Sequence, residues 1–268
     1  MKKISPKNKH YYENILPEIK TLEKNKILNT YLGKKGYTIY KISLTNKILD
    51  FIKSELTFTP FVQNSLVNSP SFSIYMESTQ KIYVPRFWGI NVFGYPKKIK
   101  IPTGTSIKLK FNGCLREYQT NVLNAYLKAI KFENKEETNC EGSALIELFN
   151  RERKTVLALK IIECIQKKTI IFVHKTFLKN QWIERIQEYL PDAKIGLIQG
   201  QIIDIENKDI VIAMIQSLSM KSYPDNMFDD FGFSLYDEVH HLSSSVFSNC
   251  LRKCTTLYSL GLSATMNR

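Results

Sequence analysis

Between residues 143 and 263, short apolar runs alternate with longer segments in which apolar residues recur at helical spacing. The apolar runs predict strands at 143–149, 169–174, 195–199, 209–214, 231–237 and 258–263. The longer segments predict helices at 116–130, 154–166, 177–189 and 243–253. Apolar strands separated by helices are typical of a parallel sheet that is covered on both faces. The sequence therefore predicts an α/β fold, whose ligands bind beyond the carboxyl ends of the strands.

The first 110 residues follow no single period. Apolar spacing predicts helical stretches between 15 and 32 and a short helix at 45–56, whereas 72–75, 81–85 and 107–111 read as strands. Aromatic residues mixed with Gly and Pro at 86–96 indicate turns. We therefore expect a smaller α+β module at 1–110, followed by the α/β domain at 111–268.

The net charge of +13 is unevenly placed along the chain. Residues 1–110 hold 19 Lys or Arg against 6 Asp or Glu, and residues 111–268 hold 19 of each. A basic module beside a neutral one suits a polyanion, most simply nucleic acid. A lysine-rich coding bias explains the surplus equally well. The basic and aromatic residues between 86 and 100 fit phosphates and bases, but the core of a small domain uses aromatic residues too.

Cysteine usage and the N-terminus narrow the class of protein. The five cysteines form no CxxC pair, which argues against a disulfide framework or a zinc finger. Cys250 and Cys254 lie near His240 and His241, but buried structural thiols are more common than a metal site of this kind. The N-terminus lacks the apolar stretch of a signal peptide, and no apolar run is long enough to span a membrane. We expect an intracellular protein with no membrane partner.

Candidate chemistry lies at the predicted strand ends. Asp237 and Glu238 end one apolar run, and Lys154-Thr155 opens the helix that follows the first strand of the domain. Hydrolysis of a nucleoside triphosphate requires a cradle for the phosphates, a metal ion and a group that activates water. Asp237 suits Mg²⁺ and Glu238 suits a general base. The order Lys-Thr, then Asp-Glu, then Ser263-Ala264-Thr265 at a further strand end is hard to obtain by chance.

In these motifs the chain resembles the superfamily-two DExH-box helicases. Lys154-Thr155 is similar to the end of motif I, residues 237–240 to the DExH box and residues 263–265 to motif III. The likeness is nearest to helicases of large DNA viruses, including the poxvirus transcript-release type, and covers about residues 80–268. It implies a RecA-like domain, the first of the two that the family has, with ATP and Mg²⁺ as cofactors and nucleic acid, DNA or RNA, as partner. If the protein is viral, its place is the host cytoplasm or the virion.

The resemblance also implies a role for each matching residue. The catalytic pair is Glu238, which activates water, and Asp237, which with Thr155 organises Mg²⁺. The nucleotide-binding residues are Lys154, Thr155, Gln119 and Arg116. The residues expected to contact nucleic acid are His174, Lys175, Gln181, Gln216 and Ser217. The residues expected to couple the two activities are His240, Ser263 and Thr265.

Two departures from the family change the expected activity. Arg151-Glu152-Arg153 stands where motif I has glycines, which the loop needs for positive φ and for close approach to phosphate. Met266 replaces the usual Pro, and the sequence given has no second RecA-like domain after Arg268. We expect a degenerate helicase-like protein with weak or absent ATP hydrolysis and no unwinding by the chain alone. Two alternatives stay open: the N-terminal half of an active helicase completed in trans by a second RecA-like chain, and a non-enzymatic module that binds nucleic acid or the transcription machinery.

Overall fold

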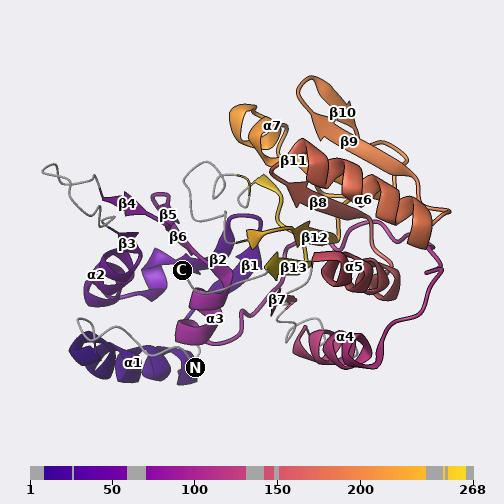
Figure 1. Ribbon diagram of the computed structural model, residues 1–268. Coiled ribbons are helices and arrows are strands. Elements are labelled where there is room, and N and C mark those ends of the chain that lie inside the picture. The colour runs from indigo at the N-terminus through magenta and orange to yellow at the C-terminus, as the bar shows by residue number, and fades with distance from the viewer. Residues whose placement is uncertain are drawn as a thin grey trace, which may run out of the picture. The chain divides into compact units, whose positions relative to one another are not determined.

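The computed structural model describes residues 9–25, 27–58, 71–130, 142–147, 151–239, 250 and 253–263. The chain divides into two compact units, residues 1–100 and residues 101–268 (Figure 1). Residues 101–110, which we assigned to the first module, belong to the second unit. Most of the helix predicted at 243–253 lies outside the described residues.

The first unit is an α+β module. Its four-stranded antiparallel sheet has the order β1-β2-β6-β5, with β1 (Thr30–Gly33), β2 (Gly36–Tyr40), β6 (Lys81–Val84) and β5 (Met76–Glu77). A separate pair joins β3 (Thr57–Phe58) to β4 (Phe72–Ser73). The helices are α1 (Lys9–Lys24), α2 (Asn46–Glu55) and α3 (Arg86–Phe93), with a 3₁₀ turn η1 (Lys41–Ser43).

Two local predictions for this unit were wrong. The aromatic segment expected to form turns includes a helix, α3, which begins after Pro85 and ends at Gly94 with φ +76°. Gly89 allows that helix to pack closely, because a Cβ there would lie 2.4 Å from Cγ of Tyr37 on β2. The predicted helical stretch up to residue 32 also ends too late, since Leu32 belongs to strand β1.

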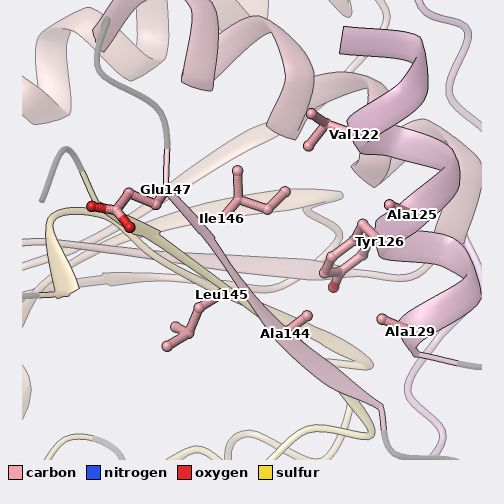
Figure 2. Close-up of a pocket in the computed structure, with 8 residues that line it drawn as sticks. All are labelled: Val122, Ala125, Tyr126, Ala129, Ala144, Leu145, Ile146 and Glu147. Carbon is pink, nitrogen blue, oxygen red and sulfur yellow. The ribbon is translucent and has the colours of Figure 1, made fainter. Parts of the chain in front are cut away.

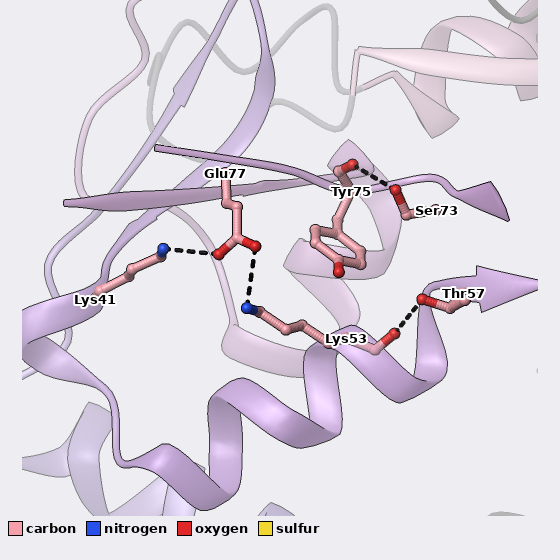
Figure 3. Close-up of polar contacts among 6 residues, drawn as sticks. All are labelled: Lys41, Lys53, Thr57, Ser73, Tyr75 and Glu77. Carbon is pink, nitrogen blue, oxygen red and sulfur yellow. Dashed lines mark hydrogen bonds and ion pairs between the residues drawn. The ribbon is translucent and has the colours of Figure 1, made fainter. Parts of the chain in front are cut away.

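Glu77 joins three elements of the first unit (Figure 3). Its carboxylate lies 2.7 Å from Nζ of Lys41 in η1 and 3.0 Å from Nζ of Lys53 in α2. Hydrogen bonds from Lys41 and then from Lys53 lower the pKa of Glu77 below its ordinary value. These two ion pairs therefore hold the end of β5 against η1 and α2.

The second unit is built on a seven-stranded sheet in the order β10-β9-β11-β8-β12-β13-β7. Its strands are β7 (Ser143–Glu147), β8 (Thr169–Val173), β9 (Ile195–Gln199), β10 (Ile202–Asp204), β11 (Ile210–Met214), β12 (Phe233–Tyr236) and β13 (Tyr258–Ser263). All neighbours are parallel except β10 with β9. The helices are α4 (Glu117–Ala129), α5 (Arg151–Ile165), α6 (Thr176–Tyr189) and α7 (Ile215–Met220).

Alternate strand residues supply two separate cores, as the pleat requires. Ile171 and Val173 of β8 pack with Trp182 and the other apolar residues of α4, α5 and α6. Ile170 and Phe172 pack on the opposite face with α7 and the segment that follows it. Both faces of the sheet are therefore covered, which confirms the predicted α/β fold class.

One predicted strand of this unit was wrong. Residues 107–111 form no strand, although Ile107 N–H donates to the Gln166 carbonyl at 3.0 Å. Gln166, just past α5, also bonds Leu109 through its side chain, accepting from N–H at 3.0 Å and donating to the carbonyl at 2.7 Å. A helix end can satisfy single backbone groups of a neighbouring segment but cannot extend a ladder. No helix in the described parts of the chain is long and apolar enough to cross a membrane.

Candidate nucleotide site

Lys154, Asp237, Glu238 and Ser263 lie at the carboxyl edge of the second unit's sheet or directly beyond it. Strands β8, β12 and β13 run parallel, with Tyr236 paired to Phe172 on one side and to Gly261 on the other. The Asp237 N–H continues this pairing by donating to the Phe172 carbonyl at 3.1 Å. Because parallel strands end at the same edge, the segments after β7, β8, β11 and β12 converge there.

Lys154 places a buried ammonium group at this edge of the sheet. Helix α5 begins three residues before it, at Arg151, so Lys154 lies in the first turn of the helix. Its side chain is 2% exposed, and Nζ makes no hydrogen bond within the described part of the chain. The ammonium instead faces Glu238, with 3.8 Å between Nζ and Oε1. A buried ammonium without hydrogen bonds is costly unless a ligand supplies acceptors.

Glu238 reaches Lys154 from an unusual backbone conformation. Its φ is +54°, in the left-handed region that costs a residue other than Gly about 1–2 kcal/mol. The side chain is only 4% exposed. Strain of this kind persists where the surrounding structure enforces it, often at functional sites. The turn after β12 thus directs a carboxylate inward towards Lys154.

Asp237 is held by Trp182, a residue of α6. The indole Nε1 donates to Oδ2 of Asp237 at 3.0 Å, and Trp182 is 1% exposed. Burial raises the pKa of Asp237 above its ordinary value, while the hydrogen bond from Trp182 opposes that shift. Nothing in the spacing of the sequence indicates this contact, because Trp182 and Asp237 are far apart in the chain.

These groups fit a magnesium nucleotide. The buried Lys154 ammonium has no hydrogen-bond acceptor among the described residues and suits phosphate oxygens, which the first turn of α5 also favours. Asp237 and Glu238 supply carboxylate oxygens, the ligands that Mg²⁺ prefers. Thr155, beside Lys154, is buried as well. Bound Mg²⁺ would neutralise the phosphate charge that develops during hydrolysis.

The residues expected to recognise the adenine lie on α4. The Oε1 atom of Gln119 accepts from the Arg116 N–H at 2.9 Å, so Gln119 caps the start of its own helix. Gln119 is buried, whereas Arg116 is exposed. Their role towards a nucleotide remains a prediction.

Four of the residues expected to contact nucleic acid, His174, Lys175, Gln216 and Ser217, directly follow β8 or β11. The Gln216 amide donates to the His174 carbonyl at 2.8 Å, which joins the two segments. The Ser217 hydroxyl accepts from the N–H of Gly200, in the turn between β9 and β10, at 2.8 Å. Lys175 and Gln216 are exposed. Gln181, on α6, is half-buried.

Sequence reasoning missed two residues beside this surface. The ring of Phe177 is exposed, and Nζ of Lys175 lies 5.9 Å from its centroid. Lys221 donates to the carbonyl of Gly200 and to Oε1 of Gln201, which fixes the turn after β9. The basic and aromatic composition of 174–179 was the available signal for the first of these.

Some predicted residues lie outside the described structure. His240 and Thr265 are among them, as are the side chains of residues 151–153, whereas Ser263 is fully buried at the end of β13. Within the described residues no group of three or more His, Cys, Asp or Glu could hold a metal ion. Cys250 and Cys254 are both buried thiols.

An apolar pocket of about 250 Å³ lies between α4 and β7, apart from Lys154 and Asp237 (Figure 2). In Figure 2 the side chain of Ile146 points towards α4, whereas Leu145 points away from it and is 62% exposed. The pocket is lined by Val122, Ala125, Tyr126, Ala129, Ala144, Leu145, Ile146 and Glu147. Only Glu147 among these carries a charge, so the pocket is not a second phosphate site.

The fold and the site together define the first RecA-like domain of a superfamily-two helicase. Residues 112–268 match the family described as "Type III restriction enzyme, res subunit", and the chain belongs to that family. Similar proteins include one from Acanthamoeba polyphaga mimivirus that is named an ATP-dependent RNA helicase. It is 30% identical over 247 residues, which cover 90% of this chain and 46% of the relative.

Two further likenesses agree with this assignment. A DNA 3'-5' translocase of Sulfurisphaera tokodaii is 32% identical over 154 residues, 58% of this chain and 31% of the relative. The crystal structure of the UvsW helicase from bacteriophage T4 superposes with a TM-score of 0.56 at 15% identity, over 89% of this chain and 92% of that one. The last likeness concerns the fold alone. The chain spans less than half the length of these two sequence relatives.

Proposed function

We propose that the second unit binds ATP-magnesium at Lys154, Thr155, Asp237 and Glu238, and that nucleic acid binds at the surface after β8 and β11. The observation that carries the proposal is the buried Lys154 ammonium, 3.8 Å from Glu238 and without a hydrogen bond among the described residues. Two buried charges so loosely matched stabilise a fold poorly, because desolvation offsets most of their attraction. A ligand that adds phosphate oxygens would supply the hydrogen-bond acceptors that Lys154 lacks among the described residues.

The roles follow from the chemistry of each group. Lys154 would contact phosphate oxygens, and Asp237, fixed by Trp182, would orient towards Mg²⁺. Glu238 would accept a proton from the attacking water. Trp182 joins this site to α6, whose N-terminal end carries Lys175 and so faces the proposed nucleic-acid surface.

We propose further that turnover is weak. Arg151 and Arg153 replace the glycines that leave room for phosphate in this family. Unwinding would require a second RecA-like domain beside the first, and one alternative is an active helicase to which this stretch contributes the N-terminal half. In the non-enzymatic alternative, the chain is a module that binds nucleic acid or the transcription machinery. Its binding would then be the same with and without ATP.

Phosphate release with Mg-ATP, measured with and without an oligonucleotide, tests the activity. We expect slow release that nucleic acid stimulates and that Glu238→Gln abolishes. Lys128→Gln, in the last turn of α4, removes an exposed charge that has no role in the proposed site and serves as the control. Release that is equal in Glu238→Gln and in the unmodified chain would refute the catalytic assignment.

A further inference from the structure

One face of the first unit's sheet combines three tyrosines with three lysines. Register places Tyr31 opposite Thr38, and Thr38 opposite Tyr83. In the next row Tyr40 lies opposite Lys81. Because cross-strand partners and alternate residues share a face, all five point to the same side.

The other side of the same sheet is apolar. Leu32, Tyr37, Ile39, Ile82 and Val84 are buried there, and α3 packs against β2. On the first side Tyr31, Tyr40, Tyr83 and Lys81 are only half-buried. We call Tyr31, Tyr40, Tyr83, Lys35, Lys81 and Lys100 the tyrosine–lysine face.

The lysines of this face lie against its rings. Nζ of Lys81 is 4.9 Å from the ring centroid of Tyr40 and 5.6 Å from that of Tyr31. Nζ of Lys100 is 4.4 Å from the Tyr31 centroid, and a further lysine, Lys35, lies 5.4 Å from that of Tyr83. Each ring is therefore presented beside a cation.

The acidic residues of the first unit lie on other elements or on the other side of the sheet. Residues 1–100 contain six of them, of which Glu13, Glu18 and Glu23 lie on α1 and Asp50 and Glu55 on α2. The sixth is Glu77, which pairs with Ile82 on the apolar side and is bonded to Lys41 and Lys53. None of the residues that form the face is acidic, so its field is positive.

We infer that the tyrosine–lysine face is a second binding site, for single-stranded nucleic acid, distinct from the surface after β8 and β11. Ammonium groups would meet backbone phosphates, and tyrosine rings would stack on unpaired bases. Two strand spacings, about 10 Å, separate Tyr31 from Tyr83, which suits two or three nucleotides. A duplex hides its base faces and so could use only the lysines. The charge surplus of the first unit, 17 Lys or Arg against 6 acids over residues 1–100, complements a polyanion.

Fluorescence anisotropy on the full chain, with labelled dT20, rU20 and a 20-base-pair duplex, tests this site. Tyr31→Ala and Tyr83→Ala should each weaken binding of the single strands about tenfold, whereas Tyr31→Phe keeps a ring and should bind normally. Phe72→Ala, at an exposed ring on β4, is the matched aromatic control. Thermal unfolding of each variant identifies any loss of fold.

Charge variants keep the inference testable if an alanine variant unfolds. Lys81→Gln/Lys100→Gln should reduce the slope of log K against log salt by about 1.4, since each single-strand phosphate contact contributes about 0.7. Lys20→Gln/Lys24→Gln, on α1, removes the same charge and should leave the slope unchanged. Binding should not depend on nucleotide.

The result that overturns the inference is equal affinity and equal slope in the face variants and their controls, or tighter binding of the duplex than of either single strand. Lys175→Gln tests the surface after β8 separately, so that surface and the tyrosine–lysine face can fail independently.

Discussion

Replacing Trp182 with Phe removes one donor from the candidate site while keeping an aromatic ring. The indole Nε1 lies 3.0 Å from Oδ2 of Asp237, and this hydrogen bond is the largest of the interactions that oppose the effect of burial on the pKa of that carboxyl group. The variant should therefore destabilise the ionised form of Asp237. Its protonated form should be little affected.

The magnitude follows from the charge and burial of the partners. A hydrogen bond to a charged group contributes about 1.5–3 kcal/mol, and the smaller ring adds a cavity cost of about 1 kcal/mol. Of these two contributions, only that of the hydrogen bond depends on pH. Burial already raises the pKa of Asp237, and loss of Trp182 raises it further, so the variant's loss of stability should be fully present at about pH 8 and shrink as pH falls towards that pKa.

Urea unfolding followed by circular dichroism at several pH values measures both parts. The control is Trp88→Phe in the first unit, whose ring packs against Phe51 and Phe93. That control should lose a similar amount at every pH. A loss in Trp182→Phe that is also constant with pH would be a cavity effect alone, and it would refute the claim that Trp182 holds the Asp237 carboxylate.

Two further predictions concern the packing of each unit. The pKa of Glu77 is lowered by Lys41 and Lys53, so this partly exposed cluster should add about 0.5–1 kcal/mol above the ordinary pKa of a glutamate and lose it as pH falls through the lowered value. Unfolding of Glu77→Gln at neutral and acidic pH checks this, and a deficit that persists in acid would contradict it. Burial raises the pKa of the Cys254 thiol, whereas Cys114 is exposed, so a thiol reagent followed by mass spectrometry should label Cys114 in the native chain and Cys254 only after unfolding. Equal labelling of Cys114 and Cys254 in the native chain would show that reagent reaches the core on the α7 face of the sheet, to which Cys254 belongs.

The sheet of the second unit could be predicted from sequence because its central strands are buried on both faces. Such strands appear as unbroken apolar runs, as at residues 169–173 and 210–214. The edge strand β10 was missed because it is only three residues long, and its two adjacent isoleucines, both exposed, do not alternate with polar residues. Strand β7 was predicted, although the last two residues of the prediction, 148 and 149, lie outside the residues that the structure describes.

Only the residues that belong to recognisable motifs could be predicted as part of the site. The order of Lys154, Asp237 and Ser263 along the chain, with the parallel topology, was enough to place all three at one edge. The left-handed turn at Glu238 and the Trp182 hydrogen bond depend on tertiary packing and leave no local signal. The tyrosine–lysine face was missed for a similar reason, since β2, which sets its register, was not predicted.

Calorimetric titration with Mg-ATP tests the central claim most directly, when it is run on the unmodified chain, on Lys154→Ala and on Arg151→Gly/Arg153→Gly. We predict weak binding by the chain, at least tenfold weaker or absent binding by Lys154→Ala, and clearly tighter binding by the glycine variant. Tight binding by the unmodified chain that the glycine variant does not improve would contradict the proposed weakening of the phosphate loop. Binding that Lys154→Ala leaves unchanged, or no binding by any of the three, would contradict the nucleotide site itself.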